Sequence, residues 1–209
     1  MTHASRLTES RWNQLWQRLG GAAPVGSFAQ LLTAYGEPQR AYHTAAHIDA
    51  CLGHFDAWRA LAVHPDRVEL ALWTHDLVYD TQRQDNEAAS AAQTCAWLGQ
   101  AGLAEHAPEV EELILATRHQ QAPSEPDAAL VVDLDLSILA SPPESYGRYE
   151  AAIRAEFAWV PEPLFRVGRG KVLRHLLDMP RLYQHPPLAE RWEQPARDNL
   201  RRALAKLGD

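Results

Sequence analysis

The sequence predicts an all-α protein, for three reasons. Apolar residues recur at the three- and four-residue spacing of a helix, first at Trp12, Leu15, Trp16 and Leu19 and then along most of the 209-residue chain. Residues that cap helices precede these stretches, and glycine or proline follows them. The one ambiguous stretch, 128–139, is rich in β-branched residues, but its helical surroundings favour a helix.

Composition and charge exclude several classes of function. With 46% hydrophobic and 22% charged residues, the chain has the composition of one soluble domain, residues 1–209. The net charge of −7 leaves no basic excess for a nucleic-acid backbone. No run approaches the roughly 18 apolar residues of a membrane span, and residues 1–11 contain no signal-peptide core. We therefore expect a cytoplasmic protein with no nucleic-acid and no membrane partner.

The two cysteines are expected to be free thiols. Cys51 and Cys95 both lie in apolar helical patterns, where cysteine behaves as a small hydrophobic residue. Two cysteines in such positions do not match a disulfide scaffold or a zinc ribbon.

The first helices are predicted from their caps. Ser10 is the expected N-cap of a helix that Gly20 ends, and Ser27 is the expected N-cap of a second helix that ends at Gly36. After a turn at residues 37–40, Thr44 is the expected N-cap of a third helix.

The fourth helix carries the most unusual residues of the chain. It begins near residue 67 and runs into the adjacent pair His75 and Asp76, which apolar residues surround. Asp80 follows one helical turn later, so we expect its carboxylate to face the same site. Such a pair is costly to bury unless a metal or hydrogen bonds satisfy it.

Further helices are expected along the rest of the chain. Their approximate ranges are 86–99, 108–119, 128–139, 144–159, 164–177 and 188–207. Residues 120–127 contain two prolines and are expected to form an exposed loop.

Ligand-type residues interrupt three of these apolar helical faces. They are His47, His75 and Asp76, followed by either Asp133 or Asp135. His43 is an alternative to His47, since it lies four residues earlier. Facing helices can present such dispersed residues to one point. Two imidazoles and two carboxylates suit one divalent transition metal, namely Mn, Fe, Co, Ni or Zn, and leave coordination positions open.

The order of these residues resembles the HD superfamily of metal-dependent phosphohydrolases, which is named for the pair at His75 and Asp76. Further local matches are to a bacterial subfamily of predicted HD phosphohydrolases. They lie at Tyr42–Ile48, Asn86–Ala91, Ile114–His119, Asp133–Leu139, Ile153–Phe157 and Gly168–Arg169. The resemblance implies an HD-type helical fold whose core spans about residues 35–177, with the C-terminal helix packed on it.

A more distant resemblance is to the alarmone hydrolases, which act on guanosine tetra- and pentaphosphate. It covers His75 to Thr81. In those enzymes a Glu-Asp pair follows the HD motif and orients the hydrolytic water. This chain keeps the acid at Asp80 but has Tyr79 in place of the glutamate, so the resemblance does not extend to the alarmone substrate.

Together these features predict a hydrolase of phosphoric ester or anhydride bonds, acting on a small phosphorylated molecule such as a nucleotide. The expected reaction is hydrolysis of a phosphomonoester or a pyrophosphate by a metal-activated water. The expected roles are metal ligation by His47, His75, Asp76 and Asp135, catalysis by Asp80 and Glu87, and substrate binding by Arg40, His43 and His119. Arg169 and Lys171 are weaker candidates for phosphate contacts.

A different class of function also fits the sequence. A non-catalytic HD-type module that binds a metal or a nucleotide in a regulatory role would contain the same ligands. The retention of a full ligand set and an extra acid favours the enzyme. By analogy with related folds, a homodimer is expected.

Overall fold

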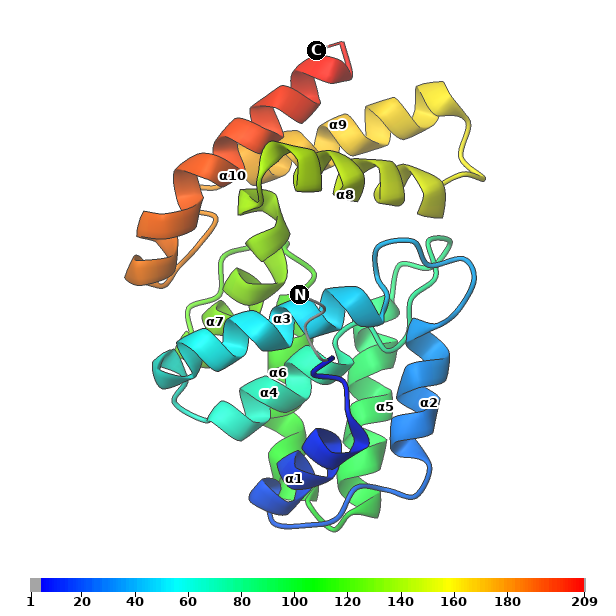
Figure 1. Ribbon diagram of the computed structural model, residues 1–209, viewed down its shortest axis with the longest axis vertical. Coiled ribbons are helices and arrows are strands. Elements are labelled where there is room, and N and C mark those ends of the chain that lie inside the picture. The colour runs from blue at the N-terminus through cyan, green and yellow to red at the C-terminus, as the bar shows by residue number, and fades with distance from the viewer. Residues whose placement is uncertain (1–4, 209) are drawn as a thin grey trace.

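The computed structural model describes residues 5–208. All the secondary-structure elements assigned within these residues are helices, which confirms the predicted all-α fold class (Figure 1). The α-helices are α1 (Glu9–Leu19), α2 (Ser27–Tyr35), α3 (Ala45–Trp58), α4 (Pro65–Thr74), α5 (Asn86–Gln100), α6 (Ala107–Ala116), α7 (Pro126–Asp135), α8 (Pro143–Glu156), α9 (Glu162–Asp178) and α10 (Pro186–Lys206). Three short 3₁₀ helices, η1 (Arg59–Leu61), η2 (Ala104–His106) and η3 (Leu136–Ala140), connect them.

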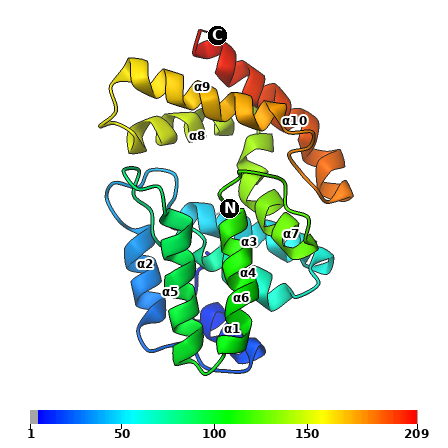
Figure 2. The same ribbon diagram turned by 180° about the vertical axis from the view of Figure 1, so that it is seen from behind.

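The helices form a body and a layer that covers one end of it. In Figure 1 the body contains α1 to α7, and α8, α9 and α10 lie together above it. Figure 2 shows the same arrangement from behind, with η3 leading from α7 up to the layer. Within the body α4 packs on α6 and α7, while α10 packs on η3 and α9. One hydrophobic core runs through both parts.

A cluster of tryptophans fills the lower part of the core. The ring of Trp12 lies 5.6, 5.3 and 6.0 Å from those of Trp16, Trp73 and Trp97, in edge-to-face geometry. The indole N–H of Trp12 donates to the hydroxyl of Ser27. These contacts fix α1 and α5 against α4, the helix that leads to His75 and Asp76.

The structure corrects two of the three predicted caps. Thr8, rather than Ser10, caps α1 by accepting the N–H of Arg11. Gly26 precedes α2, and Ser27 is buried beneath the tryptophan cluster. Ser27 is therefore the first residue of α2, and its side chain is directed to Trp12 and makes no cap hydrogen bond. Thr44 is the N-cap of α3, as predicted.

The fourth helix ends earlier than expected, at Thr74, so His75 and Asp76 lie at its C-terminal end rather than inside it. Side chains from far away in the sequence take the last carbonyls. Tyr35 donates its hydroxyl to the carbonyl of Trp73, and Arg40 donates to those of Asp76 and Leu77. These bonds replace the next helical turn.

The ambiguous stretch is helical, and its geometry changes at the site. It forms α7 as far as Asp135 and then tightens into the 3₁₀ helix η3. Val131 and Val132 lie in a helix buried on nearly all sides, where packing overrides their strand preference. Among the residues described, no helix combines the length and apolarity needed to cross a membrane.

Candidate metal centre

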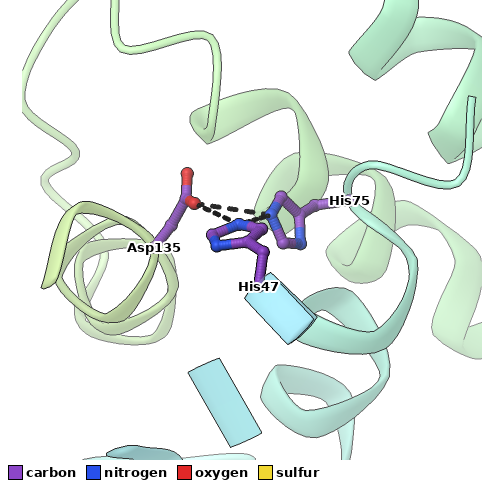
Figure 3. Close-up of side chains that lie close together, drawn as sticks. All are labelled: His47, His75 and Asp135. Carbon is purple, nitrogen blue, oxygen red and sulfur yellow. Dashed lines mark hydrogen bonds and ion pairs between the residues drawn. The ribbon is translucent and has the colours of Figure 1, made fainter. Parts of the chain in front are cut away.

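Three ligand-type side chains, His47, His75 and Asp135, form one candidate metal group, and the carboxylate of Asp76 lies beside its two histidines. His47 lies in the first turn of α3. His75 and Asp76 directly follow α4, and Asp135 is the last residue of α7. Figure 3 shows His47, His75 and Asp135 pointing toward one another from these elements.

The distances among the ligand atoms of His47, His75 and Asp135 match a single coordination sphere, and Asp76 approaches the two histidines of this group. Nε2 of His47 lies 3.2 Å from Nε2 of His75 and 3.0 Å from Oδ1 of Asp135, and Nε2 of His75 lies 3.4 Å from the same Oδ1. Oδ2 of Asp76 lies 3.5 Å from the His47 nitrogen and 3.2 Å from the His75 nitrogen. Ligands about 2.1 Å from one ion are about 3.0 Å apart in octahedral and about 3.4 Å apart in tetrahedral geometry.

Asp76 provides a second, independent indication of a cation. Its Oδ2 is buried and has no hydrogen-bond partner within residues 5–208. A buried carboxylate oxygen without a donor is costly, and this oxygen faces two imidazole nitrogens. A divalent ion between these atoms would satisfy all of them at once, so the residues present fit such an ion.

The centre is closed on its histidine side and open on its carboxylate side. The side chains of His47 and His75 are 3% and 1% exposed, whereas those of Asp76 and Asp135 are 16% and 12% exposed. A ligand set with one accessible side can hold an ion and still admit water or a substrate oxygen.

The pKa values of His75, Asp76 and Asp135 are shifted in the directions that favour a positive charge among the carboxylates. Burial alone would lower the pKa of His75 and raise the pKa of Asp76 and of Asp135. The mutual attraction outweighs burial, because the carboxylates raise the pKa of His75 and the histidines lower the pKa of both acids. A divalent ion would supply the same positive charge and displace protons.

The structure distinguishes the two candidate aspartates. The carboxylate of Asp133 is fully buried and accepts the backbone N–H groups of Gln184 and His185, together with Nδ1–H of His185. Asp133 therefore holds the segment before α10. Asp135 belongs to the candidate metal group and Asp133 does not.

His119 lies beside the ligands, where it orients one of them. Its Nε2 lies 3.0 Å from Oδ2 of Asp135, which leaves Oδ1 for the centre. The backbone of His119 has φ of 52°, a left-handed conformation that few residues other than glycine adopt. The ring of His175 hydrogen-bonds to its carbonyl. Strained backbone of this kind is often found where a site requires a fixed geometry.

His43 is not in the candidate metal group, and a buried acid holds it at the edge of the site. Its Nδ1 lies 2.8 Å from Oε2 of Glu156, which also accepts the hydroxyl of Tyr79 at 2.9 Å. The other oxygen, Oε1, accepts the backbone N–H groups of residues 41–43. His43 stacks on Tyr79 at 4.0 Å between ring centroids.

For three expected site residues the structure shows partners other than the side chains of the candidate ligands. Arg40 is buried and donates to Glu37 and to the carbonyls of residues 43, 76 and 77, so it supports the loop instead of facing a substrate. Asp80 is exposed, and its Oδ1 accepts the N–H of Gln82. Because α4 ends before His75, Asp80 does not follow it on a helical face. Glu87 lies 3.9 Å from Arg118.

A pocket of about 510 Å³ opens beside Asp135, and we call it the cationic pocket. Its basic or imidazole-bearing wall residues are His43, Arg118, His119, Arg169, Lys171 and His175, and apolar groups such as Tyr149 and Leu139 complete it. Arg169 is already paired with Glu150. Lys171 is exposed and has no ion pair within the described part of the chain.

A hollow of about 760 Å³ lies elsewhere, between the start of α4 and the loop before α7, and touches none of the four ligands. Four acids, Glu109, Glu112, Glu125 and Asp127, line it, and its basic residues Arg67 and His64 are paired with two of them, so the hollow does not favour a phosphate group.

Two residues of the site were missed in the sequence. The hydroxyl of Tyr79 donates to Glu156, which is more than 70 positions away in the chain. The spacing of apolar residues does not indicate which distant side chains will meet. The one available signal is that Glu156 is an acid beside the apolar positions Ile153 and Phe157 of a helical face.

Comparisons with protein-family models, with curated proteins and with solved structures find no match to this chain.

Proposed function

We propose that the chain is a metal-dependent phosphohydrolase of the HD type, which acts on a small phosphorylated molecule such as a nucleotide. The observation that carries this proposal is the position of the cationic pocket. It opens beside Asp135, on the accessible carboxylate side of a ligand set that fits one divalent ion.

The metal ligands would be His47, His75, Asp76 and Asp135. The nitrogen and oxygen donors favour Mn, Fe, Co, Ni or Zn. When bound, a divalent ion of this kind supplies Lewis acidity toward a phosphoryl oxygen and makes a water molecule more acidic. Without a cation, the two carboxylates would repel a phosphate group, so substrate binding and metal binding are expected to depend on each other.

The pocket residues would bind and orient the phosphorylated substrate. Lys171 and Arg118 would supply positive charge to phosphate oxygens at the rim. His43, which Glu156 holds through Nδ1, directs its remaining ring nitrogen away from that acid and would contact the substrate from the pocket wall. His119 would keep Asp135 in the orientation that ligation needs.

The size and lining of the pocket favour a nucleotide over inorganic phosphate. A volume of about 510 Å³ lies within the range of small-molecule sites. Tyr149, Leu139 and Val172 provide an apolar wall for a flat organic group. The basic side chains of the same pocket would bind the phosphate.

The test is hydrolysis of phosphomonoesters, pyrophosphates and phosphodiesters by protein reconstituted with each candidate metal. Asp76→Ala is the loss variant, and Asp80→Ala is the matched control, since Asp80 is an exposed aspartate four positions away. We expect turnover in the wild type and in Asp80→Ala, and background rates in Asp76→Ala with the helical circular dichroism spectrum intact. Metal binding without turnover of any phosphate compound would contradict the proposal and favour a regulatory module.

A further inference from the structure

A pocket of about 570 Å³ lies between the body of the molecule and the layer that covers it. Its walls come from α3 and the residues before it, from η3 and from the first half of α10, so we call it the α3–α10 pocket. α3 belongs to the body and α10 to the layer (Figure 1). The volume lies within the range of sites for small organic molecules.

The α3–α10 pocket is separated from the place where a phosphate would bind. It touches the candidate metal group only through His47, whose side chain is buried. Tyr42 and Ile138 line both this pocket and the cationic pocket, so they form a wall between the two. The ring of Tyr42 lies 4.8 Å from that of His47 and 4.6 Å from that of Tyr149. A molecule in the α3–α10 pocket would therefore not be the phosphorylated substrate.

The charge of this pocket differs from that of the chain as a whole. None of the 14 residues that line it is acidic, although the chain has 27 acidic residues and only 20 lysines and arginines. Arg191 is exposed at the pocket and makes no hydrogen bond or ion pair within residues 5–208. A guanidinium group without a carboxylate partner, in a wall without acids, is suited to bind an anion.

Two further polar groups of the same wall have no hydrogen-bond partner in the described part of the chain. The ring of His54 is one of them. Burial and the nearby Arg191 and Arg6 lower the pKa of His54, so the ring is neutral at neutral pH and can form hydrogen bonds without adding charge. The other is the hydroxyl oxygen of Ser141, which is buried. Unpartnered groups of this kind are uncommon in folded proteins.

The rest of the pocket is apolar and open. Ala46 and Ala50 lie one helical turn apart on α3, and both are exposed, so their small side chains leave space. The ring of Trp192 is buried in the wall and lies edge to face with that of His54, 5.1 Å away. This surface suits a flat organic group.

We infer that the α3–α10 pocket binds a small aromatic carboxylate, as a ligand separate from the substrate. The carboxylate would pair with Arg191, and the aromatic body would fill the space beside Ala46 and Ala50. One guanidinium beside a neutral imidazole matches a single negative charge, whereas a phosphomonoester carries about 1.5 to 2. This inference goes beyond the proposed function, because it requires neither a metal nor hydrolysis.

The experiment is titration calorimetry of the purified protein with three carboxylates, namely benzoate, 2-naphthoate and indole-3-acetate, each beside its amide. The amide has nearly the same shape and no charge. Arg191→Ala removes the cation, and Ala50→Phe fills the pocket but keeps the cation. Arg201→Ala, which changes another exposed arginine of α10, is the control.

We expect at least one carboxylate to bind about 10-fold more tightly than its amide, the value of one charge-assisted hydrogen bond. Arg191→Ala should remove this difference, Ala50→Phe should abolish binding of the carboxylate and the amide, and Arg201→Ala should change neither. The inference is wrong if none of the carboxylates binds saturably, if the difference persists in Arg191→Ala, or if Ala50→Phe binds as the wild type does.

Competition with a phosphate probe distinguishes the two pockets. Metal-loaded protein saturated with the carboxylate should bind thymidine 5′-phosphate with unchanged affinity, because the two ligands occupy different pockets. Displacement of one by the other would place the carboxylate in the cationic pocket and overturn the inference. Failure of thymidine 5′-phosphate to bind would count against the proposed function alone, since the carboxylate titration needs no metal.

Discussion

Nδ1 of His43 lies 2.8 Å from Oε2 of Glu156, although 113 positions separate the two residues in the chain. This contact joins the end of α8 to the loop before α3. With its two oxygens, Glu156 accepts five hydrogen bonds, from the N–H groups of residues 41–43, from His43 and from Tyr79. The loop that enters α3 and presents His47 therefore depends on one buried carboxylate.

Replacing this carboxylate by an amide is expected to destabilise the protein. In Glu156→Gln, an NH₂ group meets donors that previously had an acceptor, and hydrogen bonds to a charged group are lost, at a cost of about 2–3 kcal/mol. Urea denaturation measures the free energy of unfolding. Glu162→Gln, which alters an exposed acid of α9, is the control and should change it by less than about 0.5 kcal/mol.

The same carboxylate predicts how stability depends on pH. Burial would raise the pKa of Glu156, but the hydrogen bonds and charge of His43 and the loop N–H groups outweigh it and lower the pKa from 4.5 to about 2. An acid whose pKa is lower in the folded than in the unfolded protein stabilises the fold fully at pH values above its unfolded pKa. This stabilisation is lost as the pH falls through its folded pKa. The difference of about 2.5 units corresponds to about 3 kcal/mol. The gap in unfolding free energy between wild type and Glu156→Gln should shrink between pH 4.5 and 2; a constant gap would contradict this.

His119 is predicted to tune metal affinity without being essential for it. His119→Asn keeps a residue that tolerates φ of 52°, but its amide is too short to reach Asp135. Loss of a group that orients a ligand should weaken metal binding by about 10- to 100-fold. Titration of metal-free protein with Co²⁺ measures this. His64→Ala, which removes a histidine paired with Asp127 instead, should leave the affinity unchanged.

Asp133 is predicted to matter for stability and not for the metal. Asp133→Asn removes an acceptor from the N–H groups of Gln184 and His185, and should cost about 1–3 kcal/mol while the metal stoichiometry stays the same. Thermal unfolding and elemental analysis of one preparation check both parts. A metal-free Asp133→Asn protein that retains its fold would show that the wrong aspartate has been assigned.

A cluster of ion pairs around the buried acid Glu69 is expected to contribute to stability and not to the metal site. Glu69 has a side chain 2% exposed, and it pairs with Arg11, Arg18 and Arg59. Removing its charge in Glu69→Gln takes away the buried acid that the three arginines share and leaves each of them with only Asp56 or Asp66, at a cost of about 3 kcal/mol. Glu144→Gln, which breaks the exposed pair with Arg148, should cost less than about 1 kcal/mol. Similar losses in both variants would contradict the assigned role.

Sequence patterns predicted the helices because each helix buries an apolar face whose spacing is local. The same patterns misplaced the end of α4, because Tyr35 and Arg40 from other elements take its last carbonyls. The expected role of Asp80 depended on that helix continuing. Long-range contacts decide such ends, and they are not visible in local spacing.

The sequence narrowed the candidate metal ligands to a few residues but did not decide between the two aspartates. His47, His75 and Asp76 were predicted as ligands, and Asp133 and Asp135 were both candidates. Two residues apart in a helix, the aspartates point in different directions, and the placement of α10 determines that Asp133 is used elsewhere. Glu156 could not be assigned, because its role exists only where α8 meets the loop.

The most direct test of the central claim is the metal content of the purified, untagged protein, measured by elemental analysis beside Asp135→Ala and Asp80→Ala. The account predicts about one divalent transition metal per chain in the wild type and in Asp80→Ala, and none in a folded Asp135→Ala protein. A wild-type protein that contains no such metal, and whose unfolding temperature does not change when Mn²⁺, Co²⁺, Ni²⁺ or Zn²⁺ is added, would contradict it.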